Sequence, residues 1–378
     1  MAGAARAWPL NVRRARADDR AAVMEFASTT WDGWDYIPRA WDVWLDAPDG
    51  VLLVGVAEAG ADGPPRDAEG KELPAGRPVA VARVAMLSPD EAWLEGIRVD
   101  PRVRGLGVAT DLQVAELRWA QASGARLVRY ATGQRNEASH RLGARHGFAQ
   151  LHALRNWHSH AGTAPFDDEH DDEDDEENET SGFEATARAE AAALRQTMLA
   201  QLAADGLICV PEAGDAAWSR LAADPTFIAA GRLCERRGWT FQRLSRAMFE
   251  AHLERAEAIT LDGGDGWALA VLHREPAPSE DVDLHLAVLA GDGRAVLRLV
   301  DRLHELAGRR VRFWLPEPDP PLLRGLEADF EAARFHGRPW TLHILGRPLD
   351  DGRPLPEPET PGGLVLGDEP TPLRPAGD

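Results

Sequence analysis

Residues 95–109 read EGIRVDPRVRGLGVA, and this stretch decides the fold. The apolar residues that lead to Val99 predict the end of a strand, and Asp100-Pro101 predicts a turn. From Val108 onward, apolar residues recur at helical spacing and predict a helix. The stretch is therefore a strand, a short loop and the first turn of a helix.

The loop itself carries Gly105 and Gly107, which let backbone amides approach a ligand without hindrance from a Cβ atom. Amides aligned with the positive end of a helix form an anion site, and Arg104 adds a cation at its rim. This arrangement suits a pyrophosphate. A dinucleotide-binding GxGxxG turn is the competing interpretation, but this loop follows the third predicted strand and lacks that spacing. A glycine turn with only a structural purpose is the other alternative.

Outward from this stretch, the periodicity predicts alternating strands and helices across residues 10–160. In chain order these are helices at 16–28 and 31–44, strands at 51–58, 79–86 and 92–99, a helix at 108–122, a strand at 127–131 and a helix at 137–146.

The second half of the chain repeats this order at an offset of roughly 187 residues, the signature of a duplicated fold. Phe335-His336-Gly337 stands near where Gly147-Phe148 would fall. The matching segments are strands at 266–273 and 282–289, a helix at 294–306 and a strand at 311–315.

Composition separates four segments. A first domain is expected at 10–160 and a second at 183–348. Between them, 161–182 is an acidic, self-repelling linker for which we expect disorder. The tail at 349–378 is dense in Pro and Gly, and we expect disorder there as well.

The net charge is −20, but residues 167–179 alone hold 11 acidic side chains, so the remainder carries −9. A negative surface disfavours nucleic acid as a partner, because phosphate binding needs basic residues. The only lysine, Lys71, lies in a Gly/Pro-rich loop, which excludes a P-loop lysine or a Schiff-base lysine.

The chain has no apolar run long enough to cross a bilayer and no apolar secretion signal at its start. Its two cysteines, Cys209 and Cys234, lie without metal-ligand spacing. We therefore expect a cytoplasmic protein without a structural metal or a disulfide framework. The abundance of Ala, Arg, Gly and Pro is typical of a bacterial genome rich in G and C. A monomer and a homodimer are both compatible with these features.

Two motifs resemble the acetyl-CoA signatures of the GNAT superfamily of N-acetyltransferases. The first is Val99-Asp-Pro followed by Arg104-Gly-Leu-Gly-Val-Ala109. The second is Asn136-x-x-Ser139-x-x-Leu142, followed by Gly147-Phe148. The resemblance implies a GNAT fold, an α/β architecture with a mixed sheet, in two tandem domains, with acetyl-CoA as co-substrate.

The resemblance also assigns residues to acetyl-CoA. The backbone of Ile97 to Val99 would pair with the pantetheine arm as an added strand does, and 104–110 would hold the pyrophosphate. Asn136 would stand beside the pantetheine. The implied cofactor-binding residues are Ile97, Arg98, Val99, Arg104, Gly105, Leu106, Gly107, Val108, Ala109, Thr110 and Asn136.

Catalysis requires the free-base amine and a proton for the departing thiolate. Glu95, interpreted with the strand parity of Ile97, is the candidate general base; a solvated strand-end carboxylate is its alternative. The family's usual acid, a tyrosine after the leucine of the second motif, is replaced by Gly143. His140 is the candidate substitute, with a plain surface histidine as the alternative. Asn136 completes the candidate catalytic set.

Acceptor sites of this fold lie near the first helices, where the sequence reads WDGWDYIP from Trp31 to Pro38. Trp34, Asp35 and Tyr36 are the candidate substrate residues, because aromatic rings and a carboxylate can receive an ammonium group. An aromatic core stripe is the alternative, and it is the favoured interpretation for the tryptophans that follow in this helix.

A narrower resemblance, to the histidine N-acetyltransferase branch, rests on Asp35-Tyr-Ile-Pro38 together with the first acetyl-CoA motif. It implies a small amine or a free amino acid as acceptor. In the second half, Asp292 would set a negative charge where a pyrophosphate should lie, which favours a degenerate domain. Direct transfer in a ternary complex is expected, since no cysteine lies near the motif. A non-catalytic acyl-CoA-binding protein is the alternative function.

Overall fold

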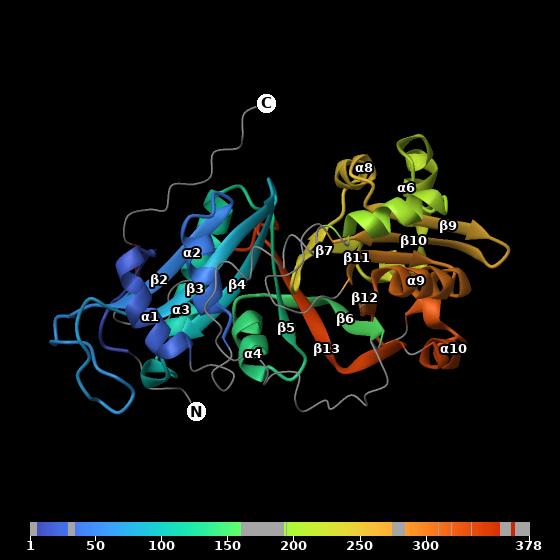
Figure 1. Ribbon diagram of the computed structural model, residues 1–378. Coiled ribbons are helices and arrows are strands. Elements are labelled where there is room, and N and C mark those ends of the chain that lie inside the picture. Colours follow the sequence, from blue (N-terminus) through green and yellow to red (C-terminus); the bar gives the residue numbers. More distant parts are fainter. Residues whose placement is uncertain are drawn as a thin grey trace. The chain divides into compact units, whose positions relative to one another are not determined.

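The computed structural model describes residues 6–28, 35–159, 193, 195–273, 284–308, 310–318, 320–333, 335–355 and 364–366, and its elements are labelled in Figure 1. The chain forms two compact units. Unit 1 consists of Met1–Thr132, Asn136–Ala149 and Leu345–Asp378, and unit 2 of Gly133–Arg135 and Gln150–Ile344.

Unit 1 is built on a mixed sheet. Strands β1 to β4 pair antiparallel in sequence order, and β5 joins β4 in parallel. β14 adds a parallel strand to the outer edge of β1. The strands are β1 (Leu10–Arg14), β2 (Gly50–Ala57), β3 (Arg77–Ser88), β4 (Glu91–Val99), β5 (Leu127–Gly133) and β14 (Leu364–Leu366).

Helices cover both faces of this sheet, which explains why β2 is buried along its whole length. Leu53 and its same-face neighbours pack with α3 (Val108–Ala122) in one core. Leu52 and its neighbours pack with α1 (Arg20–Ala27) and α2 (Ile37–Leu45) in a second core. Alternating side chains of one strand thus reach two different cores, as the pleat requires.

Two short 3-10 turns and one helix complete the description of unit 1. η1 (Ala17–Asp19) leads into α1, η3 (Pro101–Val103) follows β4, and α4 (Glu137–Arg145) follows β5. α3 begins and ends where the periodicity predicts. α2 begins only at Ile37, because Pro38 at the first turn favours a helix start there.

Unit 2 has its own sheet, in which β6 pairs antiparallel with β12, and β12 pairs in parallel with β11. β11, β10 and β9 then pair antiparallel. The strands are β6 (Ala149–Ser159), β9 (Ala258–Gly263), β10 (Gly266–Leu272), β11 (Leu284–Gly291) and β12 (Val311–Pro316); a small hairpin is made by β7 (Leu233–Arg237) and β8 (Thr240–Arg243).

The amphipathic helix α9 (Gly293–Ala307) covers one face of this sheet, and its apolar stripe packs on β10, β11 and β12. The opposite face packs against a second group of helices. Unit 2 also contains the helices α6 (Gly214–Ala223), α7 (Pro225–Ala229), α8 (Arg246–Glu254) and α10 (Glu327–Ala332), with the turns η4 (Pro211–Ala213) and η5 (Pro321–Leu323).

The predicted mixed α/β architecture is confirmed, and the order strand, strand, helix, strand, helix, strand occurs in both halves of the sequence. The strand that ends this order in the second half, β13 (Phe335–Pro348), is divided between the units at Ile344/Leu345. No described helix has the length and apolar composition needed to span a bilayer. The predicted acidic linker lies outside the described residues.

Of the predicted tail at 349–378, the structure describes residues 349–355 and 364–366. Leu349 is buried in the core of unit 1, and Leu355 packs against the same core. The backbone of Leu364–Leu366 pairs with Leu10 to Val12 as β14. Burial of Leu349 and the packing of Leu355 offset the entropy lost when residues 349–355 dock.

Candidate active site

The strand β4 contains a bulge at Gly96. Glu95 is paired with Arg83 of β3 and Arg98 with Val81, so two residues of β4 stand opposite one residue of β3. Gly96 has a φ of +72°, and a Cβ there would lie 2.7 Å from the Trp44 ring. Only glycine fits both the backbone and the space.

The bulge reverses the expected parity of the strand. Glu95 and Arg98 both face the side of the sheet that carries α2, as their contacts below demonstrate. Ile97 and Val99 instead pack against the core on the α3 side. The sequence-based assumption that Glu95 shares a face with Ile97 is therefore wrong, because periodicity alone contains no extra residue.

The backbone of β4 also leaves its parallel partner early. The pairs with β5 run from Glu91–Leu127 to Trp93–Arg129. Residues 97–99 lie beyond this ladder, and Arg98 and Val99 keep their pairing with β3. Their other edge is thus the place where an extended ligand can add as a strand.

After the η3 turn, the loop reaches α3 through two glycines in left-handed conformation. Gly105 has a φ of +80° and Gly107, the N-cap of α3, a φ of +79°. The N-cap residue Gly107 has no side chain, so no N-cap side chain accepts a hydrogen bond from the first N–H groups of α3. A Cβ at Gly105 would meet nothing within 4 Å, so this side of the loop is open. These features suit an anion at the helix start.

The residues of the loop differ in their exposure to solvent. Leu106 and Val108 are buried and hold the loop to the core, whereas Arg104 is exposed. Asp100 accepts a hydrogen bond from the Arg102 backbone (2.9 Å) and fixes the preceding turn. Ala109 is half-buried in the first helical turn.

A second cation at the loop was missed by the sequence reasoning. Arg145, in the last turn of α4, donates to Thr110 Oγ1 in the first turn of α3 (3.1 Å). Arg145 lies inside the second motif, between its leucine and its glycine, but nothing in the motif predicts the contact. The structure therefore places Arg104 and Arg145 at the same helix start from two different elements.

On the face of the sheet that carries α2, Arg98 contacts two of the candidate substrate residues. Its Nε donates to Asp35 Oδ2 (2.5 Å), and its guanidinium lies 5.2 Å from the centre of the Tyr36 ring. Asp35 also accepts the Ile37 N–H (2.9 Å), and its side chain is buried. The Asp35 carboxylate is thus neutralised by Arg98, whereas the 43% exposed Tyr36 faces solvent. Trp34 lies outside the described residues.

Glu95 is not the solvated carboxylate of the alternative interpretation. It forms an ion pair with the buried Arg83, and its side chain is only 12% exposed. Arg83 also binds Asp49 (2.8 Å) and lies over the Trp44 ring. Trp41 and Trp44 are core residues, as their helical spacing predicts.

α4 carries the other two catalytic candidates. Asn136 is its N-cap, and the side-chain oxygen accepts the Ser139 N–H (3.1 Å). His140, one turn further along, is half-buried. A Cβ at position 143 would overlap the Tyr130 hydroxyl, so a tyrosine cannot stand there. Tyr130 itself donates to the Ser139 carbonyl (3.0 Å), and burial raises the pKa of its hydroxyl to about 12.

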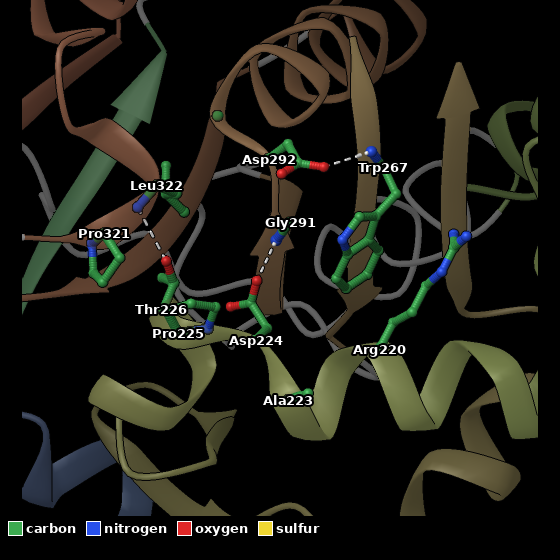
Figure 2. Close-up of a pocket in the computed structure, with 11 residues that line it drawn as sticks. Arg220, Ala223, Asp224, Pro225, Thr226, Trp267, Gly291, Asp292, Pro321 and Leu322 are labelled. Carbon is green, nitrogen blue, oxygen red and sulfur yellow. Dashed lines mark hydrogen bonds between the residues drawn. The ribbon is translucent and has the colours of Figure 1, made fainter. Parts of the chain in front are cut away.

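The corresponding turn of unit 2 follows β11 and opens α9 (Figure 2). Asp292 stands at the helix start, and its carboxylate accepts the Trp267 N–H (3.0 Å). Gly291 donates its N–H to Asp224 (3.0 Å), beside a cavity of about 420 Å³. A carboxylate thus occupies the helix start where unit 1 has an open glycine loop.

Comparison with known protein families finds a match over one segment of the chain. Residues 22–148, about a third of the chain, match the model of the acetyltransferase (GNAT) family. The matched segment contains the bulge, the glycine loop, α3 and α4. No curated protein matches the chain.

Several solved structures are similar to the chain at low identity. A GCN5-related N-acetyltransferase from Sphaerobacter thermophilus is 14% identical, with 94% of this chain and 98% of that chain covered and a TM-score of 0.45. One from Kribbella flavida is 14% identical, with 90% and 72% covered and a TM-score of 0.40. A GNAT-family acetyltransferase from Streptococcus pneumoniae is 17% identical, with 39% and 88% covered and a TM-score of 0.30.

Proposed function

We propose that unit 1 transfers an acetyl group from acetyl-CoA to the amine of a small molecule. The observation that carries the proposal is the uncapped start of α3, reached through two left-handed glycines directly after β4. A diphosphate needs such a helix start, and a pantetheine arm needs a free strand edge such as that of 97–99. Both features stand next to each other on one stretch of chain.

The residues present fit acetyl-CoA. Of the backbone N–H groups of 104–110, those of Arg104 and Leu106 donate to the Pro101 and Val103 carbonyls. The other N–H groups of this stretch would be the donors to the diphosphate, and the two guanidinium groups of Arg104 and Arg145 add positive charge. The backbone of 97–99 would hold the pantetheine, and Asn136 would stand beside it through its free amide donors. Acetyl-CoA supplies the activated acetyl group.

Glu95 is proposed as the general base. It lies on the same face of β4 as Arg98, which contacts Asp35 and Tyr36, so the acceptor amine would enter on this face. Glu95 would accept a proton of the incoming ammonium, directly or through a water molecule. The neutral amine nitrogen would then form a bond to the acetyl carbon while the bond to sulfur breaks, and the second proton of the nitrogen would leave to solvent. Arg83 holds the carboxylate in place during this step.

The departing thiolate needs a proton, and two observations argue against a tyrosine at position 143 or Tyr130 as its donor. Position 143 has no room for a tyrosine, and the Tyr130 hydroxyl already donates to a backbone carbonyl. His140 and solvent remain as the proposed donors. Both cysteines are buried in unit 2, which supports direct transfer without an acyl-cysteine.

The acceptor is proposed to be a small amine or a free amino acid, as the resemblance to the histidine N-acetyltransferase branch implies. We also propose that unit 2 does not catalyse transfer, because Asp292 places a carboxylate at its helix start. Repulsion between this carboxylate and a diphosphate opposes cofactor binding there.

A panel of free amino acids and polyamines, incubated with acetyl-CoA and followed by thiol release, tests the function. The proposal predicts turnover with at least one amine and none with Gly107→Asp, which puts a side chain and a charge at the helix start. Gly70→Asp is the matched control, because Gly70 has a similar φ of +85° in open space.

Binding of CoA without turnover of any amine would favour the non-catalytic acyl-CoA-binding alternative. Equal activity of the Gly107→Asp and Gly70→Asp variants would show that the loop does not hold the cofactor. Gly291→Asp is unsuitable as a control, since a Cβ at Gly291 would overlap the Trp267 carbonyl and disrupt unit 2.

A further inference from the structure

Arg347 is a buried arginine near the end of β13, and only 3% of it is exposed. Its side chain donates to two backbone carbonyls, those of His146 (2.5 Å) and Pro354 (2.9 Å). Burial lowers the pKa of this guanidinium, which signals that the charge loses hydration. The two carbonyls are neutral, and the charges that act on the guanidinium are those of Arg353 and Asp351. A buried cation whose hydrogen-bond partners are neutral costs free energy, so its position needs an explanation.

The first partner marks the end of α4. His146 is the C-cap of this helix, and Gly147 follows with a φ of +77°. The Arg347 guanidinium lies 3.8 Å from where a Gly147 Cβ would stand, so it packs directly against this turn. A cation at a helix C-terminus interacts favourably with the exposed carbonyls and the helix dipole.

The same end of α4 also contacts the glycine loop's helix. Arg145 precedes His146 and donates to Thr110 in the first turn of α3. One end of one short helix is thus bound to α3 through Arg145 and to β13 through Arg347. Any displacement of the C-cap turn moves Arg145 away from the start of α3.

The segment that carries Arg347 is itself anchored in unit 1. Leu349 donates its N–H to the Arg126 carbonyl (2.8 Å), and Leu345 and Leu349 are buried in the α3 core. Arg126 also pairs with Asp350 (2.7 Å) at the surface. Residues 345–355 therefore form a fixed support for α4, although they follow the whole of unit 2 in sequence.

We propose that Arg347 is a positioning residue of the acetyl-CoA site, supplied by the C-terminal segment 345–355. It holds the end of α4 so that Arg145 stays at the start of α3, and it adds positive charge behind the diphosphate position. This inference rests on the proposed function. It also means that the segment matched by the family, 22–148, does not contain everything its cofactor site needs.

The test compares Arg347→Met, Arg347→Lys and Arg353→Met in the full chain. Arg353 belongs to the same segment, is exposed and pairs with Asp351, so it is the matched control. In calorimetric titrations with CoA, we expect Arg347→Met to weaken binding about tenfold, the size of one lost charge-assisted contact. Arg347→Lys should recover most of this loss, and Arg353→Met should bind like wild type.

A second measurement does not depend on CoA. The pKa of His146 is lowered to about 4 by burial first, and then by the charges of Arg145 and Arg347. Arg347→Met should therefore raise the His146 pKa in an NMR titration, and Arg347→Lys should leave it low. A purely structural support without charge would not produce this difference between the two variants.

Wild-type protein that fails to bind CoA would overturn the proposed function and this role with it. CoA binding by folded Arg347→Met at wild-type affinity would overturn only the role of Arg347. An unchanged His146 pKa in Arg347→Met would likewise contradict the proposal that the charge of Arg347 acts at the end of α4.

Discussion

The charged residues of this site form ion pairs that cannot be predicted from the sequence. Glu95 is bound to Arg83, which is bound to Asp49 in turn. Asp35 is bound to Arg98. Two carboxylates that could each receive an ammonium group thus differ in access, because Glu95 keeps some exposure and the Asp35 side chain has none. This difference favours Glu95 as the base.

Replacing Glu95 with Gln keeps its shape and removes the proton acceptor. We expect kcat/KM to fall about 100-fold near neutral pH, within the range of general-base catalysis. The loss should shrink as pH rises past about 8, the usual pKa of an α-amine, because more substrate then arrives deprotonated. The pH profile of kcat/KM measures this.

Asp49→Asn is the control for Glu95→Gln, since it removes the other partner of Arg83 and leaves the Glu95 carboxylate intact. If Asp49→Asn lowered activity as much as Glu95→Gln with the same pH profile, the defect would come from the buried Arg83. Glu95 would then not be the base.

A second prediction concerns His146 and the pH dependence of the stability of the protein. Burial lowers its pKa to about 4, and neither ring nitrogen has a hydrogen-bond partner among the described residues. The unfolded chain, with a His pKa of about 6.5, binds this proton first. Stability should therefore fall as pH drops from about 6.5 to about 4, by up to about 3 kcal/mol.

His146→Leu should remove this part of the pH dependence in urea unfolding experiments. It should also leave stability at pH 7 unchanged or higher, because an unpartnered polar ring is replaced by an apolar group. A steep loss of stability at pH 7 would mean that the imidazole makes a hydrogen bond essential to the fold.

At the scale of elements, the bulge in β4 links the two faces of the site. It turns Glu95 and Arg98 toward α2 and leaves Ile97 and Val99 on the α3 side. A regular strand would place Glu95 and Ile97 on one face. The bulge exists because Gly96 accepts a positive φ and the close approach of Trp44.

Gly96→Ala should therefore destabilise the protein by about 2–4 kcal/mol, the sum of left-handed strain and overlap with Trp44. Gly105→Ala has a similar φ but open space around it, so it should cost only about 1 kcal/mol. Urea unfolding of both variants measures the difference. Similar losses of stability in the two variants would mean that α2 can shift to accommodate a Cβ atom at position 96. The Trp44 contact would then not fix the bulge.

At the scale of the whole molecule, unit 1 is discontinuous in sequence. Its core takes Leu345 and Leu349 from a segment that follows unit 2. Truncation after Ile344 should expose this core and reduce stability by several kcal/mol, as expected for the loss of two buried leucines and Arg347. Truncation after Leu355 removes β14 alone from the described residues and should cost much less. Thermal unfolding of both truncated chains distinguishes these outcomes. Equal melting temperatures would contradict the prediction that the stability of unit 1 depends on residues 345–355.

The sequence by itself determined the strand, glycine loop and helix of 95–110, the bounds of α3, and the order strand, strand, helix, strand in both halves. These depend on local periodicity, turn chemistry and helix starts, which neighbouring residues fix. Only the tertiary structure decided the parity of Glu95, the ion pairs of Asp35 and Glu95, the overlap of Tyr130 with position 143, and the contacts of Arg145 and Arg347. Each of these joins residues far apart in the chain, and a bulge or a buried arginine gains its partner only when separate elements pack together.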